Sequence, residues 1–304
     1  MVRSPVHISV CICTYKRPQL LAHLLNELQK QTIDQLFTFS IVVVDNDSSH
    51  SAQKTVEAFR EGSLVPVEYC NEPEQNIALA RNRAVQNAKG NLIAFIDDDE
   101  FPHERWLLNL YTALLAYKAD AVLGPVKPHF ETTPPPWIVK GKICERKSFK
   151  TGTVLRNASD TRTGNALLQK VLFGNDTDLF SPAFGRTGGE DVDFFRRVMA
   201  KGCVVVWCDE AVVYEIVPPE RFKKTYYLKR ALLRGKVVLL HPPLKIKVYS
   251  VLKSIIAVAL YTLILPFCFV AGTHVFMKYL IKYCDHIGKL LAAIGITPVR
   301  ERSF

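Results

Sequence analysis

Hydrophobic positions follow two different periods along the first 126 residues. Apolar runs rich in β-branched residues predict strands, and apolar residues spaced three or four positions apart predict helices. The predicted strands are residues 7–13, 39–45, 65–70, 91–96 and 121–126, and the predicted helices are residues 18–30, 51–60, 77–88 and 104–117. This alternation predicts an α/β fold in which helices cover both faces of a mostly parallel, Rossmann-like sheet.

The longest uncharged run lies near the other end of the chain. Residues 254–277 contain no Asp, Glu, Lys or Arg, and a helix needs about 20 apolar residues to cross a bilayer. Pro266 and the polar pair Thr273 and His274 interrupt the run, so a buried helix of a soluble domain is the alternative to a transmembrane or re-entrant helix. Residues 279–296, within the tail 278–304, predict an amphipathic interfacial helix or the return leg of a shallow hairpin.

The positive charge is confined to the same end. The 304 residues carry a net charge of +10, and residues 216–304 hold 15 Lys and Arg against 3 Asp and Glu, which leaves −2 for residues 1–215. Basic and aromatic residues are interleaved in residues 216–253, which predicts an amphipathic segment on an anionic membrane surface. More Lys and Arg precede the uncharged run than follow it, which predicts that residues 1–215 are cytoplasmic.

Composition and missing motifs exclude several classes of protein. The chain is 48% hydrophobic and 22% charged, which excludes disorder. Its eight cysteines form no CxxC pair, so we expect reduced thiols and neither a zinc site nor a disulfide framework. Residues 6–13 are too short for a secretory signal. No GxGxxG or GxxxxGK[ST] motif follows a predicted strand, which excludes the common dinucleotide and P-loop sites.

Four consecutive acids follow the predicted strand 91–96. Asp97, Asp98, Asp99 and Glu100 repel one another unless a cation or hydrogen-bond donors lie nearby. A hard divalent cation, Mg²⁺ or Mn²⁺, held by one or two carboxylates and substrate phosphates would relieve the repulsion. The alternative is an acidic cluster that complements the dipole of the following helix.

Two further motifs carry candidate chemistry. Residues 188–193, GGEDVD, open a predicted helix, and an ionised Asp there could take a proton from an acceptor hydroxyl, although capping the helix would also explain its acids. Arg81 and Arg83 lie in the first turns of the predicted helix 77–88. They could pair with phosphates or with the carboxylates, and a solvated helix face is the alternative.

In this order, the motifs resemble the family 2 glycosyltransferases of the GT-A fold, over about residues 7–236. The matching segments are CTYKRP (13–18), VVDNDS (43–48), ARNRA (80–84), IDDDE (96–100), TGNALL (163–168), GGEDVDFFRR (188–197) and YEIVPPERFKKTYYLKRALLRG (214–235). The last segment is typical of members that act at the bacterial inner membrane.

The resemblance implies a hexosyltransferase-like enzyme that moves a sugar from a nucleotide-sugar donor to an acceptor hydroxyl. Asp97 and Asp99 would form the DxD pair that handles the diphosphate and a divalent cation. Asp191 would be the catalytic base with Glu190 beside it, which predicts inversion at the anomeric carbon. The residues expected at the donor nucleotide are Thr14, Tyr15, Arg17, Asp45, Asp47, Arg81 and Asp98.

The acceptor side is predicted from less regular sequence. Residues 127–163 do not fit the strand and helix alternation, so we expect either a lid, in which Trp137 stacks on a sugar or lipid, or a packed surface loop. Asn165 would lie at its base. Glu215 stands where many members of the family carry His, which puts a metal-ligand role there in doubt. A lipid-linked or glycolipid acceptor fits the basic, membrane-facing tail.

Three rival functions remain. A nucleic-acid binder would explain the charge of +10, but the basic residues adjoin an apolar run and the remainder of the chain is slightly acidic, so we expect no nucleic acid. A sugar-nucleotide nucleotidyltransferase would need a Gly-rich loop after the first strand, and residues 14–18 contain no glycine. A non-catalytic relative would be expected to lack some of the carboxylates or Arg81, all of which are present.

Overall fold

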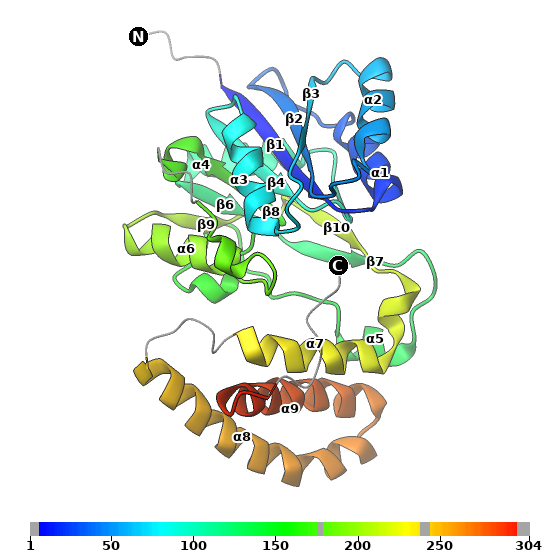
Figure 1. The fold of residues 1–304 in the computed structure, drawn as a ribbon, viewed down its shortest axis with the longest axis vertical. Helices are drawn as coiled ribbons and strands as arrows, with labels where there is room; N and C mark the ends of the chain where they lie inside the picture. The colour runs from blue at the N-terminus through cyan, green and yellow to red at the C-terminus, as the bar shows by residue number, and fades with distance from the viewer. Residues whose placement is uncertain (1–5, 175–178, 238–243, 297–304) are drawn as a thin grey trace. The chain divides into compact units, whose positions relative to one another are not determined.

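The computed structural model describes residues 6–174, 179–237 and 244–296 (Figure 1). The chain divides into two compact units. The sheet unit contains the residues up to Pro128 together with Arg146–Ile216, and the helical unit contains His129–Glu145 and the residues from Val217 onward.

A mixed sheet forms the centre of the sheet unit. Among the described residues it has seven strands, in the order β3 (Val67–Asn71), β2 (Thr38–Asp45), β1 (His7–Thr14), β4 (Leu92–Ile96), β8 (Asn165–Gln169), β6 (Ala121–Leu123) and β9 (Val205–Trp207). Only β8 runs antiparallel to its neighbours; the pairs of β1 with β2, β1 with β4, β2 with β3 and β6 with β9 are parallel. The predicted mostly parallel sheet is confirmed.

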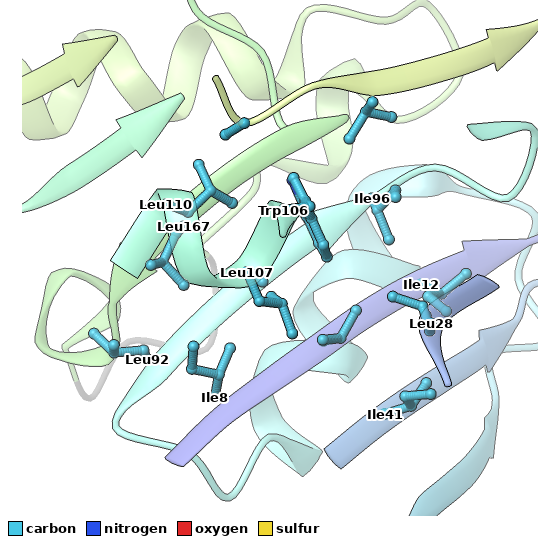
Figure 2. Close-up of a cluster of buried hydrophobic side chains, with 14 of the residues drawn as sticks. Ile8, Ile12, Leu28, Ile41, Leu92, Ile96, Trp106, Leu107, Leu110 and Leu167 are labelled. Carbon is cyan, nitrogen blue, oxygen red and sulfur yellow. The ribbon is translucent and has the colours of Figure 1, made fainter. Parts of the chain in front are cut away.

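Helices cover both faces of this sheet, as predicted. On one face α1 (Pro18–Leu28), α2 (Gln53–Gly62) and α4 (Trp106–Ala116) pack on the side chains of alternate strand residues, and Figure 2 shows part of this core around Trp106. On the other face lie α3 (Ile77–Asn87) and α6 (Glu190–Ala200). Short 3-10 turns, Ala158–Asp160, Lys170–Phe173 and Pro182–Phe184, connect these elements. Burial of both faces explains why the strands are continuous apolar runs.

A second, three-stranded sheet has the order β5 (Glu100–Pro102), β10 (Val213–Ile216) and β7 (Val126–His129). The single strand predicted at residues 121–126 is therefore wrong, because the chain leaves the large sheet after Leu123 and joins the small one at Val126. Gly124 lies at the crossing, where a Cβ atom would come 2.3 Å from the carbonyl oxygen of Ala211. Since β5 begins at Glu100, the small sheet fixes the chain directly after the three aspartates.

The helical unit contains α5 (Pro136–Gly141), a 3-10 turn at Pro219–Phe222, α7 (Lys224–Val237), α8 (Leu244–Val270) and α9 (Thr273–Ala293). Helix α9 packs against the other three helices. Trp137, Tyr227 and Met277 form the buried centre of this unit. Helices α7 and α9 approach so closely that a Cβ atom on Gly288 would lie 2.3 Å from the carbonyl oxygen of Leu232.

The uncharged run 254–277 does not form one helix, contrary to our expectation. Helix α8 ends at Val270 and α9 begins at Thr273, because Gly272 has a φ of +119° that ends the first helix. Residues 248–270 are nevertheless long and apolar enough to cross a membrane by length and composition, and their most apolar window is only 11% buried, unlike a core helix. Residues 238–243 of the predicted surface segment and residues 297–304 of the tail lie outside the described residues.

Candidate active site

The polar clusters after β1, β2 and β4 meet at one edge of the large sheet. These three strands are adjacent and parallel, so their carboxyl ends coincide. The Thr14 hydroxyl, at the end of β1, donates a hydrogen bond of 2.7 Å to the carboxylate of Asp98, which follows β4. The backbone amide of Asn46, which follows β2, donates one of 2.8 Å to the carbonyl of Thr14. Residues that are far apart in the sequence therefore share one site.

Arg17 brings two of the aspartates together. One guanidinium nitrogen lies 3.0 Å from a carboxylate oxygen of Asp98 and 3.4 Å from one of Asp99. Burial raises the pKa of Asp98 to about 6, although the charge of Arg17 opposes the shift. Asp98 is thus a buried partner of Thr14 and Arg17, whereas Asp97 is the more open carboxylate, with 44% of its side chain exposed.

Arg81 connects the aspartates to the GGEDVD motif. Its buried guanidinium donates to Glu190 on α6, lies 3.5 Å from Asp97, and sits 5.8 Å from the ring centroid of Phe180. Burial alone would lower the pKa of Arg81, but the charges of Glu190 and Asp97 raise it. Burial raises the pKa of Glu190 against the pull of Arg81. The two acidic motifs therefore meet at one permanently charged arginine.

Local structure fixes Arg81 in this position. Asn76 caps α3, because its side chain accepts hydrogen bonds from the backbone amides of Ala78 and Leu79, and its own amide donates to the side chain of Asn46 at 2.9 Å. This cap ties the start of α3 to the loop after β2. Arg81 follows one turn later, on the buried side of the helix.

The acids of the GGEDVD motif have different surroundings. Gly188 and Gly189 have φ values of +82° and +100°, so the chain turns into α6 through backbone that favours glycine. Asp193 is buried and pairs with Arg196 and Arg197 on its own helix. Asp191 is half-buried, its carboxylate accepts a hydrogen bond of 2.7 Å from the backbone amide of Val192, and it forms no ion pair with the residues that the structure describes. Asp191 is therefore the least buried of the three acids of this motif.

The expected nucleotide residues do not all face open space. Asp45 is fully buried and accepts hydrogen bonds from the amide of Ala52 at 2.7 Å and the hydroxyl of Tyr69 at 3.1 Å. Burial raises the pKa of Asp47, but hydrogen bonds from Ser49 outweigh that effect and lower it. Tyr15 is half-buried, with the ammonium of Lys16 5.1 Å from its ring centroid. Asp45 thus supports the loop after β2 through these hydrogen bonds.

A buried charge network beside Asp97 was missed by the sequence reasoning. Arg146 pairs with Glu215 and lies 3.7 Å from Glu100, whose side chain is fully buried. Burial and the charge of Asp97 raise the pKa of Glu100 well above its ordinary value, against the pull of Arg146. A Cβ atom on Gly164 would lie 2.9 Å from Asp97 and 3.0 Å from Glu100. Gly164 of the TGNALL motif is the residue in the sequence that indicates this close approach of the backbone to the two carboxylates.

The structure places two of the expected acceptor-side residues in packed surroundings. Asn165 is 2% exposed, accepts a hydrogen bond from the Trp106 indole at 2.8 Å and donates to the carbonyls of Pro125 and Ala211. Its amide is therefore used inside the core. Trp137 belongs to the helical unit, is 9% exposed and packs edge-on against Tyr227, so its ring offers no open face for stacking. Residues 127–163 are divided between the two units instead of forming one lid.

Residues 9–178 match the family model described as Glycosyl transferase family 2, which is more than half of the chain. The chain belongs to glycosyl transferase family 2. The predicted enzyme class, a glycosyltransferase, is confirmed by this match and by the relatives. The succinoglycan biosynthesis protein ExoM of Rhizobium meliloti (strain 1021) is 33% identical over 239 residues, which are 78% of this chain and 75% of that protein.

Other relatives are longer proteins. The chondroitin synthase of Escherichia coli is 27% identical over 253 residues, but the aligned part is only 36% of that protein. Among solved structures, Staphylococcus aureus TarS 1-349 has a TM-score of 0.54 at 21% identity, covering 75% of this chain and 65% of that one. The mannosyltransferase PcManGT from Pyrobaculum calidifontis has a TM-score of 0.54 at 17% identity, covering 96% and 74%. These structures support the GT-A fold.

The carboxylates of this family 2 glycosyltransferase fit a cation that is shared with a substrate. Among the described residues, no group of three or more His, Cys, Asp or Glu side chains could enclose a metal ion. Mg²⁺, however, is commonly held by one or two carboxylates together with substrate phosphates. Asp97, which is partly exposed, and Asp99, which lies beside Arg17, provide such a pair. The donor set therefore suits a cation that binds together with a diphosphate.

The raised pKa of Asp98 predicts a pH dependence of stability in metal-free protein. The folded state holds the proton of Asp98 up to about pH 6, whereas the unfolded state releases it near pH 3.8. The free energy of unfolding should therefore fall as the pH rises between these values, by up to about 3 kcal/mol from this group. Asp98→Asn should flatten the fall in chemical denaturation curves, and the exposed Asp34→Asn should not. Equal pH profiles for wild type and Asp98→Asn would contradict the assignment.

Proposed function

We propose that this chain transfers a sugar from a nucleoside-diphosphate donor to a hydroxyl group of a lipid-linked or glycolipid acceptor, with inversion at the anomeric carbon. The observation that carries the proposal is the junction at Arg81, which pairs with Asp97 of the DxD segment and with Glu190, the residue before Asp191. The reaction needs residues that bind the donor diphosphate and a base that takes the acceptor proton. The candidates for both roles lie next to Arg81.

The donor side consists of Asp97, Asp99, Arg17 and Arg81. When bound, a divalent cation would neutralise the charge of the diphosphate leaving group, with Asp97 and Asp99 as its protein ligands. Arg81 is held in place before any substrate arrives, so its positive charge needs no rearrangement as charge develops on the leaving group. Fold relatives have been crystallised with UDP-GlcNAc and with GDP-Man and Mn²⁺, which supports a nucleotide sugar as donor and does not select the nucleotide.

Asp191 acts on the acceptor side. Its carboxylate takes the proton of the acceptor hydroxyl while that oxygen attacks the anomeric carbon and the bond from this carbon to the diphosphate oxygen breaks. One displacement inverts the configuration. Glu190 is buried against Arg81 and supports the site as an ion-pair partner, so we assign the base to Asp191 and a positioning role to Glu190.

The acceptor class is inferred from relatives and from the tail. ExoM is named for succinoglycan biosynthesis and the E. coli relative for chondroitin synthesis, which supports a cell-envelope glycan as product. The net charge of +12 in residues 216–304 and the apolar helix α8 support a membrane location. We propose the cytoplasmic face of a bacterial inner membrane, where nucleotide sugars and lipid-linked intermediates meet.

Removal of divalent cations tests the donor site. EDTA should abolish release of nucleoside diphosphate from the donor sugar by purified protein, and Mn²⁺ or Mg²⁺ should restore it. Asp97→Asn and Asp99→Asn should each raise the metal concentration needed for half-maximal activity, because each removes a ligand charge. Asp120→Asn is the control, because the carboxylate of Asp120 lies outside the site, where it accepts a hydrogen bond from the backbone amide of Val204. Turnover that persists in EDTA would rule out the metal role of Asp97 and Asp99.

A further inference from the structure

Helix α8 has two faces of different character. Ser254, Tyr261 and Cys268, seven residues apart, lie on the face that is covered within the helical unit; Ser254 is fully buried and Cys268 is 6% exposed. On the opposite face, apolar residues spaced three or four positions apart form what we call the α8 stripe: Leu252, Ile256, Leu260, Leu263, Phe267 and Val270. Their exposed fractions run from 53% at Leu260 to 87% at Val270. The stripe is about 27 Å long at 1.5 Å per residue.

Helix α9 runs antiparallel along the covered face of α8 (Figure 1). The rings of Phe269 and Phe276 lie 5.5 Å apart near the turn between the helices, and the side chains of Ser254 and His286 meet at 3.0 Å near the other end. Each turn of α8 between Ser254 and Phe269 therefore has a turn of α9 beside it. The two helices must enter the hydrocarbon together or both stay out of it.

The part of α9 that lies beside α8 carries charged side chains. Lys278 and Lys282 are exposed. Asp285 forms a two-point ion pair of 3.1 Å with Arg234 of α7. If α8 crossed a bilayer, these groups would lie in its hydrocarbon core, where a charged residue costs about 2.5 to 3.5 kcal/mol on insertion scales. A spanning orientation of α8 is therefore disfavoured by the helices packed on it.

We propose that α8 lies in the plane of the membrane, with the α8 stripe in the acyl chains of one leaflet and with α7 and α9 on its water side. The occupant is lipid and not another protein, because the exposed stripe is apolar over about 27 Å and residues 216–304, which include it, carry a net charge of +12, which attracts anionic headgroups. The charged groups then stay in water or among the headgroups. This inference deepens the proposed function, since it states how the enzyme meets a lipid-linked acceptor.

Tryptophan depth measurement separates an in-plane helix from a spanning one. Leu252→Trp, Leu260→Trp and Phe267→Trp place an indole near each end and near the middle of the stripe in the full-length protein. Vesicles of equal parts phosphatidylcholine and phosphatidylglycerol carry bromine atoms either near the headgroups or near the chain ends. The three native tryptophans give a background that wild-type protein measures, and Leu64→Trp, at a fully exposed site of the sheet unit, is the control for quenching outside the membrane.

The inference predicts the same ratio of shallow to deep quenching at all three positions and none at Leu64→Trp. Deep quenching at position 260 with shallow quenching at 252 and 267 would overturn it in favour of a spanning helix. Absence of quenching together with a stable dimer in sedimentation would instead make the stripe an interface between two copies. The measurement reports the depth of the indole and does not depend on sugar transfer. Equal depths in a protein that transfers no sugar would therefore refute the proposed function and leave the in-plane orientation of α8 intact.

Discussion

Asp191→Asn is expected to lower the turnover number for sugar transfer by about 10²- to 10⁴-fold, the usual contribution of a general base. The amide keeps the size of the carboxylate but cannot accept the hydroxyl proton. Because Asp191 is half-buried and forms no ion pair with the described residues, folding and donor binding should change little. Initial rates of transfer and the dissociation constant of the donor nucleotide, measured on the same preparation, check both parts.

Asp193→Asn is the matched control for this substitution. It lies in the same turn of α6, but its carboxylate pairs with Arg196 and Arg197. It should lower the melting temperature and leave the rate per folded molecule nearly unchanged. Transfer by Asp191→Asn within a few-fold of wild type, or an equal loss of rate in Asp193→Asn, would mean that the base is another residue.

Arg81→Met is expected to cost about 3 to 5 kcal/mol of unfolding free energy, because it leaves the buried Glu190 without its partner. One oxygen of Glu190 already lacks a hydrogen-bond partner among the described residues. Sugar transfer should be lost as well, since the same guanidinium serves the diphosphate in our proposal. Urea denaturation and transfer assays on the purified variant measure the two effects.

A second substitution separates the two effects of Arg81. Arg81→Met combined with Glu190→Met removes both charges, so most of the stability should return while transfer stays lost. Arg83→Met, two residues along α3 and 44% exposed beside Glu72, should change stability by less than about 1 kcal/mol. A stable, inactive double variant supports the assignment. Recovery of transfer in the double variant would contradict a direct role of Arg81.

The order of strands and helices of the large sheet could be predicted as far as α4, because each of these strands is an apolar run and each helix has a regular stripe. The order of the later strands could not. Strand β8 is the short segment Asn165–Gln169, and it inserts antiparallel between β4 and β6. A five-residue apolar run has no period that separates strand from helix, and its place in the sheet depends on long-range packing.

Within the site, the positions of Asp97, Arg81 and Glu190 followed from motifs at strand and helix ends. The network of Arg146 with Glu100 and Glu215 did not, because no local pattern links residues from three separate segments. The one local indication of this network is Gly164, where a side chain would clash with Asp97 and Glu100. In the tail, the absence of charged residues identifies the apolar run 254–277, but Gly272 divides it into two helices. This glycine between apolar residues was the evidence in the sequence for the break.

The anomeric configuration of the product tests the central claim most directly. The wild-type protein, given the nucleotide sugar that it consumes and its acceptor, makes a glycosidic bond whose configuration proton NMR reads from the coupling of the anomeric hydrogen. With a donor of α configuration we expect a β-linked product, because Asp191 supports one displacement at the anomeric carbon. An α-linked product would contradict direct displacement and with it the role given to Asp191.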